Sequence, residues 1–367
     1  MKTQTLYAYV SRGRISARPD PENPRRSLYD ADDVARLREG VPPLPVTIIG
    51  TGAVRGEATV QSSITAIIDG RLFYRGLDAV QLARTATLEE AARVLWGVRD
   101  GNPFAGLKPR IDVAYAGSSR SRLLQFIARR AEEDPPASDR SARELTLECA
   151  SVLSEMVDAV VGMGPRLHLH QRLARAWKIS ERDADILRRA LVLAADHELN
   201  GAVLATRAVA GTGASPAASA MAGLAALTGP DVSRQLSAAA ELVLEARRDP
   251  VEVLRRRFDQ EGRLAGFGHS LYPDGDPRAA ALLEAADLPR ELSLLVETGE
   301  RVTGAKASFD LALSLIVRRF NLPRDGAFDL FAVGRTAGLL AHAMDQLLEG
   351  APLRARLRYV GAEPGAH

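Results

Sequence analysis

The chain has 367 residues, of which 46% are hydrophobic and 26% are charged, so it can bury a large core and form about two or three domains. Its 48 basic and 46 acidic residues give a formal net charge of +2. This near-balance argues against a protein that coats nucleic acids without sequence preference. The single cysteine, Cys149, excludes an intrachain disulfide and makes a reducing compartment the default. The sequence lacks the apolar run of a secretory signal and any run of about 18 apolar residues, so we expect a cytoplasmic protein that does not span a membrane.

Residues 1–40 differ in pattern from the rest of the chain. A short helix and a turn are expected over 6–15, followed by a polar loop over 18–26. A helix with acidic residues near its start follows within 28–39. The sequence VPPLP at 41–45 predicts a linker, because stacked prolines cannot continue a helix.

After the linker, short extended segments are expected at 46–50, 64–69 and 70–76. From residue 88 onward alanine, leucine and arginine dominate, and alternating β-branched strands are scarce, which favours helices. The expected helices span 88–98, 119–132, 142–161, 183–196, 203–210, 216–227, 233–248, 251–261, 277–286, 290–298, 309–320 and 328–349. The pattern predicts an all-α architecture of helices packed on helices.

Three segments place polar residues at the junctions of otherwise apolar helices. The first, ADHELN, holds His197 directly after an apolar run. The second, GFGHSLYPDGDPR, places His269 after two glycines and Arg278 nine residues further on. The third, ASFDLALSL, puts Asp310 at the start of an apolar helix. Polar residues in such places have either a function or a purely structural role.

Taken alone, each segment has a structural explanation. His197 would be a capping or buried, hydrogen-bonded histidine, and the glycines before His269 would form a turn. Asp310 would stabilise the N-terminal end of a helix dipole. The pair His168 and His170 lacks two further ligands at useful spacing, so a metal site is not expected.

Taken together in chain order, these segments strongly resemble the citrate synthase family. The segment GEATVQSSITAIIDGRLFYRGLDAVQLA is similar to the family's entry segment, and ADHELN is similar to its oxaloacetate-binding histidine motif. GFGHSLYPDGDPRA resembles the second histidine motif, and FAVGRTAGLLAHAMDQLLEG with RARLRYVG resembles the arginine-bearing C-terminal helix and tail. The resemblance covers about residues 55–361. It implies an all-α fold with a large domain of 46–225 and 321–367 and a small domain of 226–320 that closes over substrate.

The resemblance also implies a site for oxaloacetate and an acyl-coenzyme A, with no metal or redox cofactor. The family holds oxaloacetate with histidines and arginines, because guanidinium groups bind carboxylates bidentately. The matching residues are His197, His269, Arg278 and Arg335, with Arg354 or Arg356 reaching across the interface of a homodimer. Asp310 matches the base that takes a proton from the acyl thioester, and His269 matches the acid that polarises and protonates the oxaloacetate carbonyl.

One catalytic position departs from the family pattern. The family's first catalytic histidine lies in a glycine-proline-(x)-histidine-glycine-glycine stretch, which here reads LTGPDVSRQL. Val232 stands in the place of the histidine, and Ser233 and Arg234 replace the two glycines. The six histidines stand at 168, 170, 197, 269, 342 and 367, so none of them can fill the place. Ser233 or Arg234 is a candidate substitute for the lost oxyanion donor.

Two functions follow from the resemblance and its departure. The first is an acyltransferase that condenses acetyl-coenzyme A, or another short acyl-coenzyme A, with oxaloacetate to give citrate and coenzyme A. The second is a catalytically impaired homologue that binds the same molecules as a metabolite sensor or regulator. The missing histidine favours the second function.

Residues 1–40 also resemble part of a winged helix-turn-helix of the MerR or excisionase type. The matching parts are a recognition helix and turn at 6–15, a wing, and a further helix after it. The usual first helix is missing, so we expect at most weak, salt-sensitive DNA binding through the arginines of this segment. The alternative is a helical extension that packs on the dimer.

Overall fold

The structure is a computed structural model that describes residues 17–19, 27–29, 62–107, 115–165, 167–349 and 353. The chain divides into two compact units, Met1–Val60 with Arg354–His367 and Gln61–Leu353. In the first unit, β1 (Ala17–Pro19) pairs antiparallel with β2 (Ser27–Tyr29). This pair of strands falls where a wing was expected. The helix expected within 6–15 lies outside the described residues. Residues 28 and 29 of the helix expected within 28–39 belong to β2 instead, and the rest of that helix lies outside the described residues, so the helix-turn-helix stays a prediction.

A small antiparallel sheet opens the second unit, with the strand order β3-β4-β5. The strands are β3 (Thr65–Ile68), β4 (Arg71–Tyr74) and β5 (Leu77–Asp78). Asp69 and Gly70, with φ of 50° and 69°, form the two-residue turn that Asp-Gly favours in hairpins. The extended segments predicted at 64–69 and 70–76 are confirmed, and the one predicted at 46–50 lies outside the described residues.

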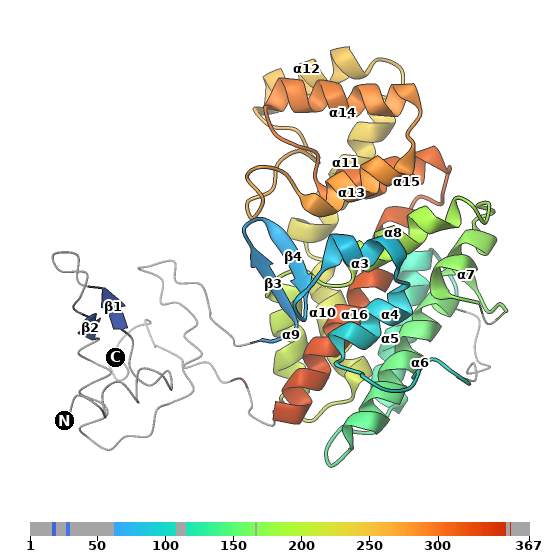
Figure 1. Cartoon of the computed structure of the whole chain (residues 1–367). Coiled ribbons are helices and arrows are strands. Elements are labelled where there is room, and N and C mark those ends of the chain that lie inside the picture. Colours follow the sequence, from blue (N-terminus) through green and yellow to red (C-terminus); the bar gives the residue numbers. More distant parts are fainter. Residues whose placement is uncertain are drawn as a thin grey trace, which may run out of the picture. The chain divides into compact units, whose positions relative to one another are not determined.

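Helices follow the sheet along the described part of the second unit (Figure 1). They are α3 (Ala79–Thr85), α4 (Leu88–Leu95), α5 (Ser119–Glu133), α6 (Ala142–Val161), α7 (Leu169–Ala176), α8 (Ala184–Ala194), α9 (Gly201–Ala210), α10 (Pro216–Leu227), α11 (Pro230–Glu245), α12 (Pro250–Glu261), α13 (Pro277–Ala286), α14 (Arg290–Thr303), α15 (Phe309–Arg319) and α16 (Gly326–Glu349). The all-α prediction is confirmed. Helices α3 and α7 were not expected, because so few turns carry little periodic signal.

Helix α16 forms the centre of the larger hydrophobic core. It contacts α4, α5, α6, α8, α9 and α10 (Figure 1). Its residues Leu330, Val333, Ala337 and Leu340 are completely buried. A helix that is apolar on nearly all sides belongs in the middle of a bundle rather than at its surface. The arginine-bearing segment of the sequence is therefore part of the core.

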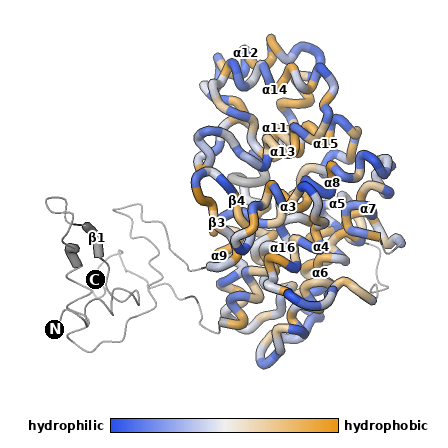
Figure 2. Tube along the Cα trace, in the orientation of Figure 1, coloured by the Kyte–Doolittle hydropathy of each residue, from blue (hydrophilic) through white to orange (hydrophobic). Residues whose placement is uncertain are grey.

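A second, smaller core lies among α11, α12, α14 and α15. It contains Leu242, Leu254, Leu295, Leu311 and Leu315. Figure 2 shows hydrophobic and hydrophilic residues alternating around the turns of α12 and α14, as expected for amphipathic helices. This core falls within the segment that was predicted as a small domain, whose boundaries stay a prediction.

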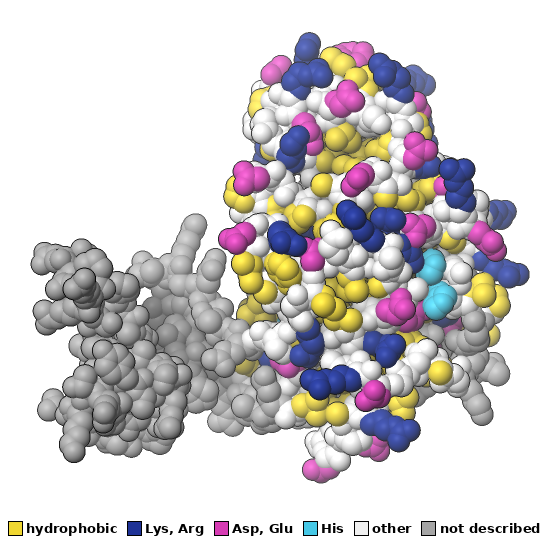
Figure 3. All heavy atoms as spheres, viewed as in Figure 1, with side chains coloured by type: hydrophobic (Ala, Val, Ile, Leu, Met, Phe, Trp, Pro, Cys, Tyr) yellow, Lys and Arg dark blue, Asp and Glu magenta, His cyan; other side chains and the backbone are white. Residues whose placement is uncertain are grey.

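Charges of both signs are interspersed on the face of the described residues seen in Figure 3. Within the described ranges, no helix is long and apolar enough to cross a lipid bilayer. The same ranges contain no group of three His, Cys, Asp or Glu side chains that could hold a metal ion. His168 and His170 stack with their ring centroids 5.8 Å apart, and the ring of His168 lies 3.3 Å from the Glu89 carboxylate.

Helices α5 and α6 are joined by a buried ion-pair network. The guanidinium of Arg130 lies 2.8 Å from Asp134 and 2.9 Å from Glu155, and all three side chains are less than a tenth exposed. Replacing Arg130→Met would leave both carboxylates buried without this cation. We expect a loss of about 3–5 kcal/mol in the free energy of unfolding, measured by urea denaturation. The control Arg256→Met removes an exposed partner of Glu245 and should cost about 1 kcal/mol or less. Equal losses in the two variants would contradict this prediction.

Candidate active site

The main chain that carries His197 is held from two sides. Tyr74 of β4 is completely buried, and its hydroxyl lies 3.0 Å from the carbonyl oxygen of Asp196. From α16, Gly338 donates its N–H to the carbonyl of Ala195 at 2.9 Å. A Cβ atom at position 338 would lie 2.4 Å from that oxygen, so only glycine permits this approach. These contacts fix the backbone directly before His197.

The second histidine motif is paired with another chain segment. Gly266 and Gly268 have φ of 83° and 80°, a left-handed conformation that glycine adopts without strain. The N–H of Gly268 donates to the carbonyl of Lys306 at 2.8 Å. The N–H of Ser308 donates to the carbonyl of Gly266, also at 2.8 Å. This pairing brings the motif against the start of α15, which carries Asp310.

His197, His269 and Tyr272 form one cluster. The hydroxyl of Tyr272 lies 2.9 Å from Nε2 of His197. The ring centroids of His197 and His269 are 5.4 Å apart in an edge-to-face arrangement, and those of His269 and Tyr272 are 5.0 Å apart. His197 is 5% exposed and Tyr272 is 2% exposed. The structure thus brings both predicted histidines together around a tyrosine.

Two buried arginines lie close enough to this cluster to influence the pKa values of its side chains. Arg278 is 4% exposed, and its Cζ lies 5.6 Å from the centroid of the Tyr272 ring. Its Nε and Nη2 donate to the carboxylate of Asp276 at 3.0 and 2.7 Å. Arg335 is 1% exposed and donates its Nε–H to the carbonyl of Ala194 at 3.0 Å. Asp276 occupies one edge of the Arg278 guanidinium, so a ligand carboxylate must use the other edge.

Burial sets the protonation states of these groups. Burial, with the nearby charges of Arg278 and Arg335, lowers the pKa of His197. Burial and Arg278 also lower the pKa of His269, so both imidazoles are neutral at pH 7. Burial raises the pKa of Asp310 to about 6, which leaves this carboxyl mostly ionised at pH 7. Neutral imidazoles, guanidinium cations and one carboxylate base can together bind a dicarboxylate and remove a proton from a second molecule.

Comparison with known proteins identifies the family to which this arrangement belongs. The family model described as citrate synthase, C-terminal domain, matches residues 53–356. The chain belongs to the citrate synthase family. Membership places it among the condensing transferases. Citrate synthase 2 of Bacillus subtilis is 23% identical to it, in a match that covers 85% of this chain and 96% of that protein.

Solved structures share the citrate synthase fold with this chain. The citrate synthase of Thermotoga maritima matches with a TM-score of 0.67 at 20% identity, covering 85% of this chain and 96% of its own. A ternary complex of citrate synthase from Thermoplasma acidophilum with carboxymethyl coenzyme A and oxaloacetate matches with a TM-score of 0.63, also at 20% identity. That match covers 84% of this chain and 95% of the other.

Other residues predicted from the citrate synthase resemblance are placed less completely. Val232 and Ser233 lie in the first turn of α11, which begins after Gly229, but their side chains lie outside the described residues. Arg234, next along α11, is exposed. Arg354 lies outside the described residues, as does the alternative at position 356. The replacement of the family histidine at 232 and the two candidate substitute donors stay predictions.

Two residues of the site were not assigned a role from the sequence. Asp276 caps α13 by accepting the N–H of Arg278 at 3.0 Å, and Asp-Pro at a helix start is a signal for such a cap. Its second contact, with the guanidinium of the same arginine, has no sequence signal. Tyr272 lies in a turn, where its N–H donates to the carbonyl of His269 at 3.1 Å. That turn directs the hydroxyl toward His197.

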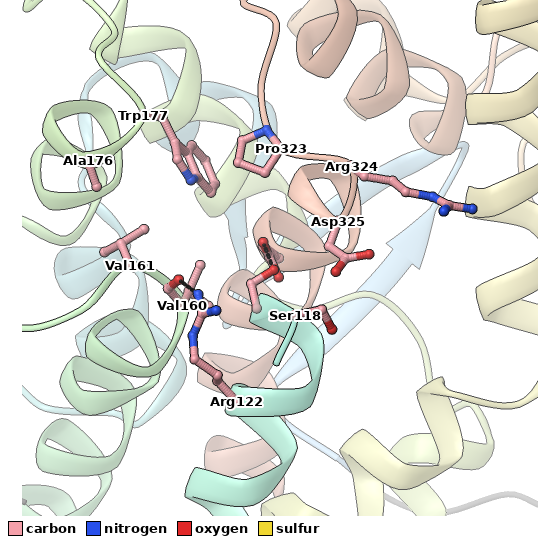
Figure 4. Close-up of a pocket in the computed structure, with 11 residues that line it drawn as sticks. Ser118, Arg122, Val160, Val161, Ala176, Trp177, Pro323, Arg324 and Asp325 are labelled. Atoms are coloured by element: carbon pink, nitrogen blue, oxygen red, sulfur yellow. Dashed lines mark hydrogen bonds between the residues drawn. The ribbon is translucent and has the colours of Figure 1, made fainter. Parts of the chain in front are cut away.

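A separate cavity of about 340 Å³ contains none of the predicted site residues. It lies between the starts of α5 and α16 and the ends of α6 and α7 (Figure 4). Arg122 reaches across to the carbonyl of Val160, while Trp177 and Pro323 line the opposite part of the wall. Asp329 also lines the cavity, is 0% exposed, and accepts a hydrogen bond of 2.7 Å from Ser119.

Proposed function

We propose that the chain condenses a short acyl-coenzyme A, such as acetyl-coenzyme A, with oxaloacetate to give citrate and coenzyme A. The observation that carries this proposal is the grouping of His197 and His269, both neutral, with the buried Arg278 and Arg335. Oxaloacetate is a dianion, and guanidinium groups recognise carboxylates by paired hydrogen bonds. The Thermoplasma acidophilum citrate synthase complex contains oxaloacetate and carboxymethyl coenzyme A, which supports the same ligand classes here.

In the proposed reaction, the carboxylate of Asp310 takes a proton from the carbon next to the acyl thioester. The resulting enolate attacks the keto carbon of oxaloacetate. A carbon–carbon bond forms, and the electron pair of the carbonyl moves to its oxygen. That oxygen takes up a proton, and water then cleaves the thioester to release citrate and coenzyme A.

His269 has the tautomer needed to protonate the new alkoxide oxygen. Its Nδ1 accepts the N–H of Leu271 at 3.2 Å, because a backbone N–H can only donate. The proton of the neutral ring is therefore on Nε2, which is free to donate to the carbonyl of oxaloacetate. A preset donor of this kind stabilises charge as it develops on that oxygen.

The enol step lacks its usual donor. In the family a histidine hydrogen-bonds the thioester oxygen, and Val232 takes its place here. Losing one oxyanion donor lowers a rate by about 10²–10³. Ser233 or Arg234 can substitute only if its side chain reaches the thioester. We therefore propose a slow enzyme.

A second function has support from the same position. If neither substitute reaches the thioester, the chain binds oxaloacetate and acyl-coenzyme A without condensing them and acts as a metabolite sensor. The absence of a histidine at position 232 favours this function. Calorimetric binding of oxaloacetate, together with no thiol release from acetyl-coenzyme A, would select the sensor over the enzyme.

Both functions require the binding of oxaloacetate, which the variant Arg278→Ala tests. Removing this guanidinium should weaken oxaloacetate binding by about 2–5 kcal/mol, the range for truncating a buried, hydrogen-bonded charge. Isothermal titration calorimetry measures the loss directly. The matched control is Arg188→Ala, because Arg188 is also buried but donates to the main chain at the end of α3. Unchanged affinity in Arg278→Ala, or no binding by the unmutated protein, would contradict the assignment.

We also propose that the working unit is a symmetric homodimer. The resemblance places Arg354 or Arg356 in the site of the partner subunit, so a single chain would lack one arginine of its oxaloacetate site. Light scattering at micromolar concentration should give twice the chain mass of 39.4 kDa. A mass of one chain, with oxaloacetate binding intact, would refute the dimer.

A further inference from the structure

Helix α16 presents a stripe of polar and small residues to the end of α8. Arg335, Gly338, His342 and Asp345 are spaced by three or four residues, so they share one face of the helix. Arg335 donates to the carbonyl of Ala194, and Gly338 donates to the carbonyl of the next residue. The third residue of the stripe, His342, also contacts the chain just before His197.

His342 contacts the residue directly before His197. It is 2% exposed, and its Nε2 lies 3.2 Å from Oδ2 of Asp196. The same carboxylate oxygen accepts a hydrogen bond from the hydroxyl of Thr65 in β3. Burial alone would raise the pKa of Asp196, but His342 and the neighbouring donors outweigh it and lower that pKa. Asp196 is therefore a buried anion that depends on these contacts.

A second contact fixes which nitrogen of His342 carries the proton. Nη1 of Arg207 lies 3.2 Å from Nδ1 of His342. A guanidinium can only donate hydrogen bonds, so Nδ1 accepts. Nε2 therefore carries a ring proton, which it donates to Asp196. Both ring nitrogens of His342 are thus used in one orientation.

Arg207 is itself held by the last member of the stripe. It is 0% exposed and forms a salt bridge of 2.9 Å with Asp345. The four side chains form a continuous series from Asp345 through Arg207 and His342 to Asp196. Such buried ionic groups add little stability compared with well-packed apolar residues. Their position directly before His197 therefore points to a role in geometry.

We propose that His342 is a positioning residue. It holds Asp196 in place and thereby sets the backbone and ring orientation of His197, so that Nε2 of His197 meets the hydroxyl of Tyr272. Only the expected effects on oxaloacetate affinity and on kcat/KM rest on the proposed function. The orientation of the His197 ring can be tested without substrate.

The test compares His342→Leu with His342→Gln in the full-length protein. Leucine removes both hydrogen bonds, whereas the glutamine amide can donate to Asp196 and accept from Arg207. The ring ¹⁵N and ¹H resonances of His197 are recorded by long-range correlation spectra, which are tractable because the chain has six histidines. We expect His342→Leu to shift the His197 ring signals and His342→Gln to restore them. The control His170→Leu removes another buried histidine and should leave them unchanged.

In the same variants, oxaloacetate affinity and kcat/KM should fall by about 10- to 100-fold for leucine and recover with glutamine, because small misplacements of a binding group have effects of this size. If His342→Leu does not fold, Thr65→Val removes the other hydrogen bond to Asp196 and should shift the same signals. A folded His342→Leu or Thr65→Val protein with unchanged His197 signals would overturn the proposal. If the unmutated protein does not bind oxaloacetate, the proposed function fails, while the ring signals still decide the role of His342.

Discussion

Replacing Asp310→Asn should lower the condensation rate by about 10²–10⁴, the usual contribution of a general base, and should also stabilise the fold. The native protein holds the Asp310 proton more tightly than the unfolded chain does, since burial raises the pKa from 3.8 to about 6. Stability is therefore lost as the pH rises from about 4 to about 6 and stays lost above it. After allowance for the partial exposure of this residue, the cost above pH 6 is about 2 kcal/mol.

Two measurements check this prediction. Urea denaturation at pH 7.5 should show a more stable Asp310→Asn variant, and the difference should vanish near pH 4. In the unmutated protein, the condensation rate should rise with pH through about 6 as the base ionises. A variant that keeps full activity would remove Asp310 from the role of base.

Asp329→Asn is the matched control for this change. Asp329 is also a buried carboxyl, and burial raises its pKa to about 7, but it lies beside the separate cavity of Figure 4. Above pH 7 the variant should gain stability on the order of 4 kcal/mol, with the condensation rate unchanged. Stabilisation in both variants with loss of activity only in Asp310→Asn would separate the catalytic role from the effect of burial.

The second prediction with a large effect is an increase in the condensation rate. The combined change Val232→His, Ser233→Gly and Arg234→Gly restores the family sequence at these positions and should raise kcat by about 10²–10³. Val232→His alone should give less, because the glycines permit close approach of the backbone to the thioester. Steady-state thiol release measures the rates. The control is the pair Ser233→Gly and Arg234→Gly without the histidine, which should give no gain.

An unmutated protein that already turns over at about 1–10³ per second would contradict the prediction of a lost donor. Arg234→Ala then becomes the informative variant. A collapse of the rate would identify Arg234 as the substitute donor. An unchanged rate would place the donor elsewhere.

The sequence predicted most helix positions because their ends carry local signals. Helices α10 and α13 have the predicted bounds, and each begins with a proline after a capping residue, Ser215 or Asp276. Helix α14 runs further than predicted, to Thr303, where Gly304 in a left-handed conformation ends it. Helix α7 is only eight residues long, and its cap is a histidine rather than a typical capping residue.

The site was predictable only as far as its motifs reach. His197, His269, Arg278 and Asp310 came from motifs, and the structure brings the elements that carry them together. The buried partners of these residues could not be predicted from sequence motifs. Arg207 and Asp345, for example, are 138 residues apart, and nothing in either local sequence indicates the salt bridge between them. Spacing along α16 was the one available signal, since His342 follows Arg335 by two helical turns.

The most direct test of the proposed function is thiol release from acetyl-coenzyme A by the unmutated protein, measured with and without oxaloacetate. The proposal predicts release that depends on oxaloacetate, slower than ordinary enzyme rates by about 10²–10³, with citrate formed in equal amount. Release that oxaloacetate does not increase, with no citrate formed, would contradict it.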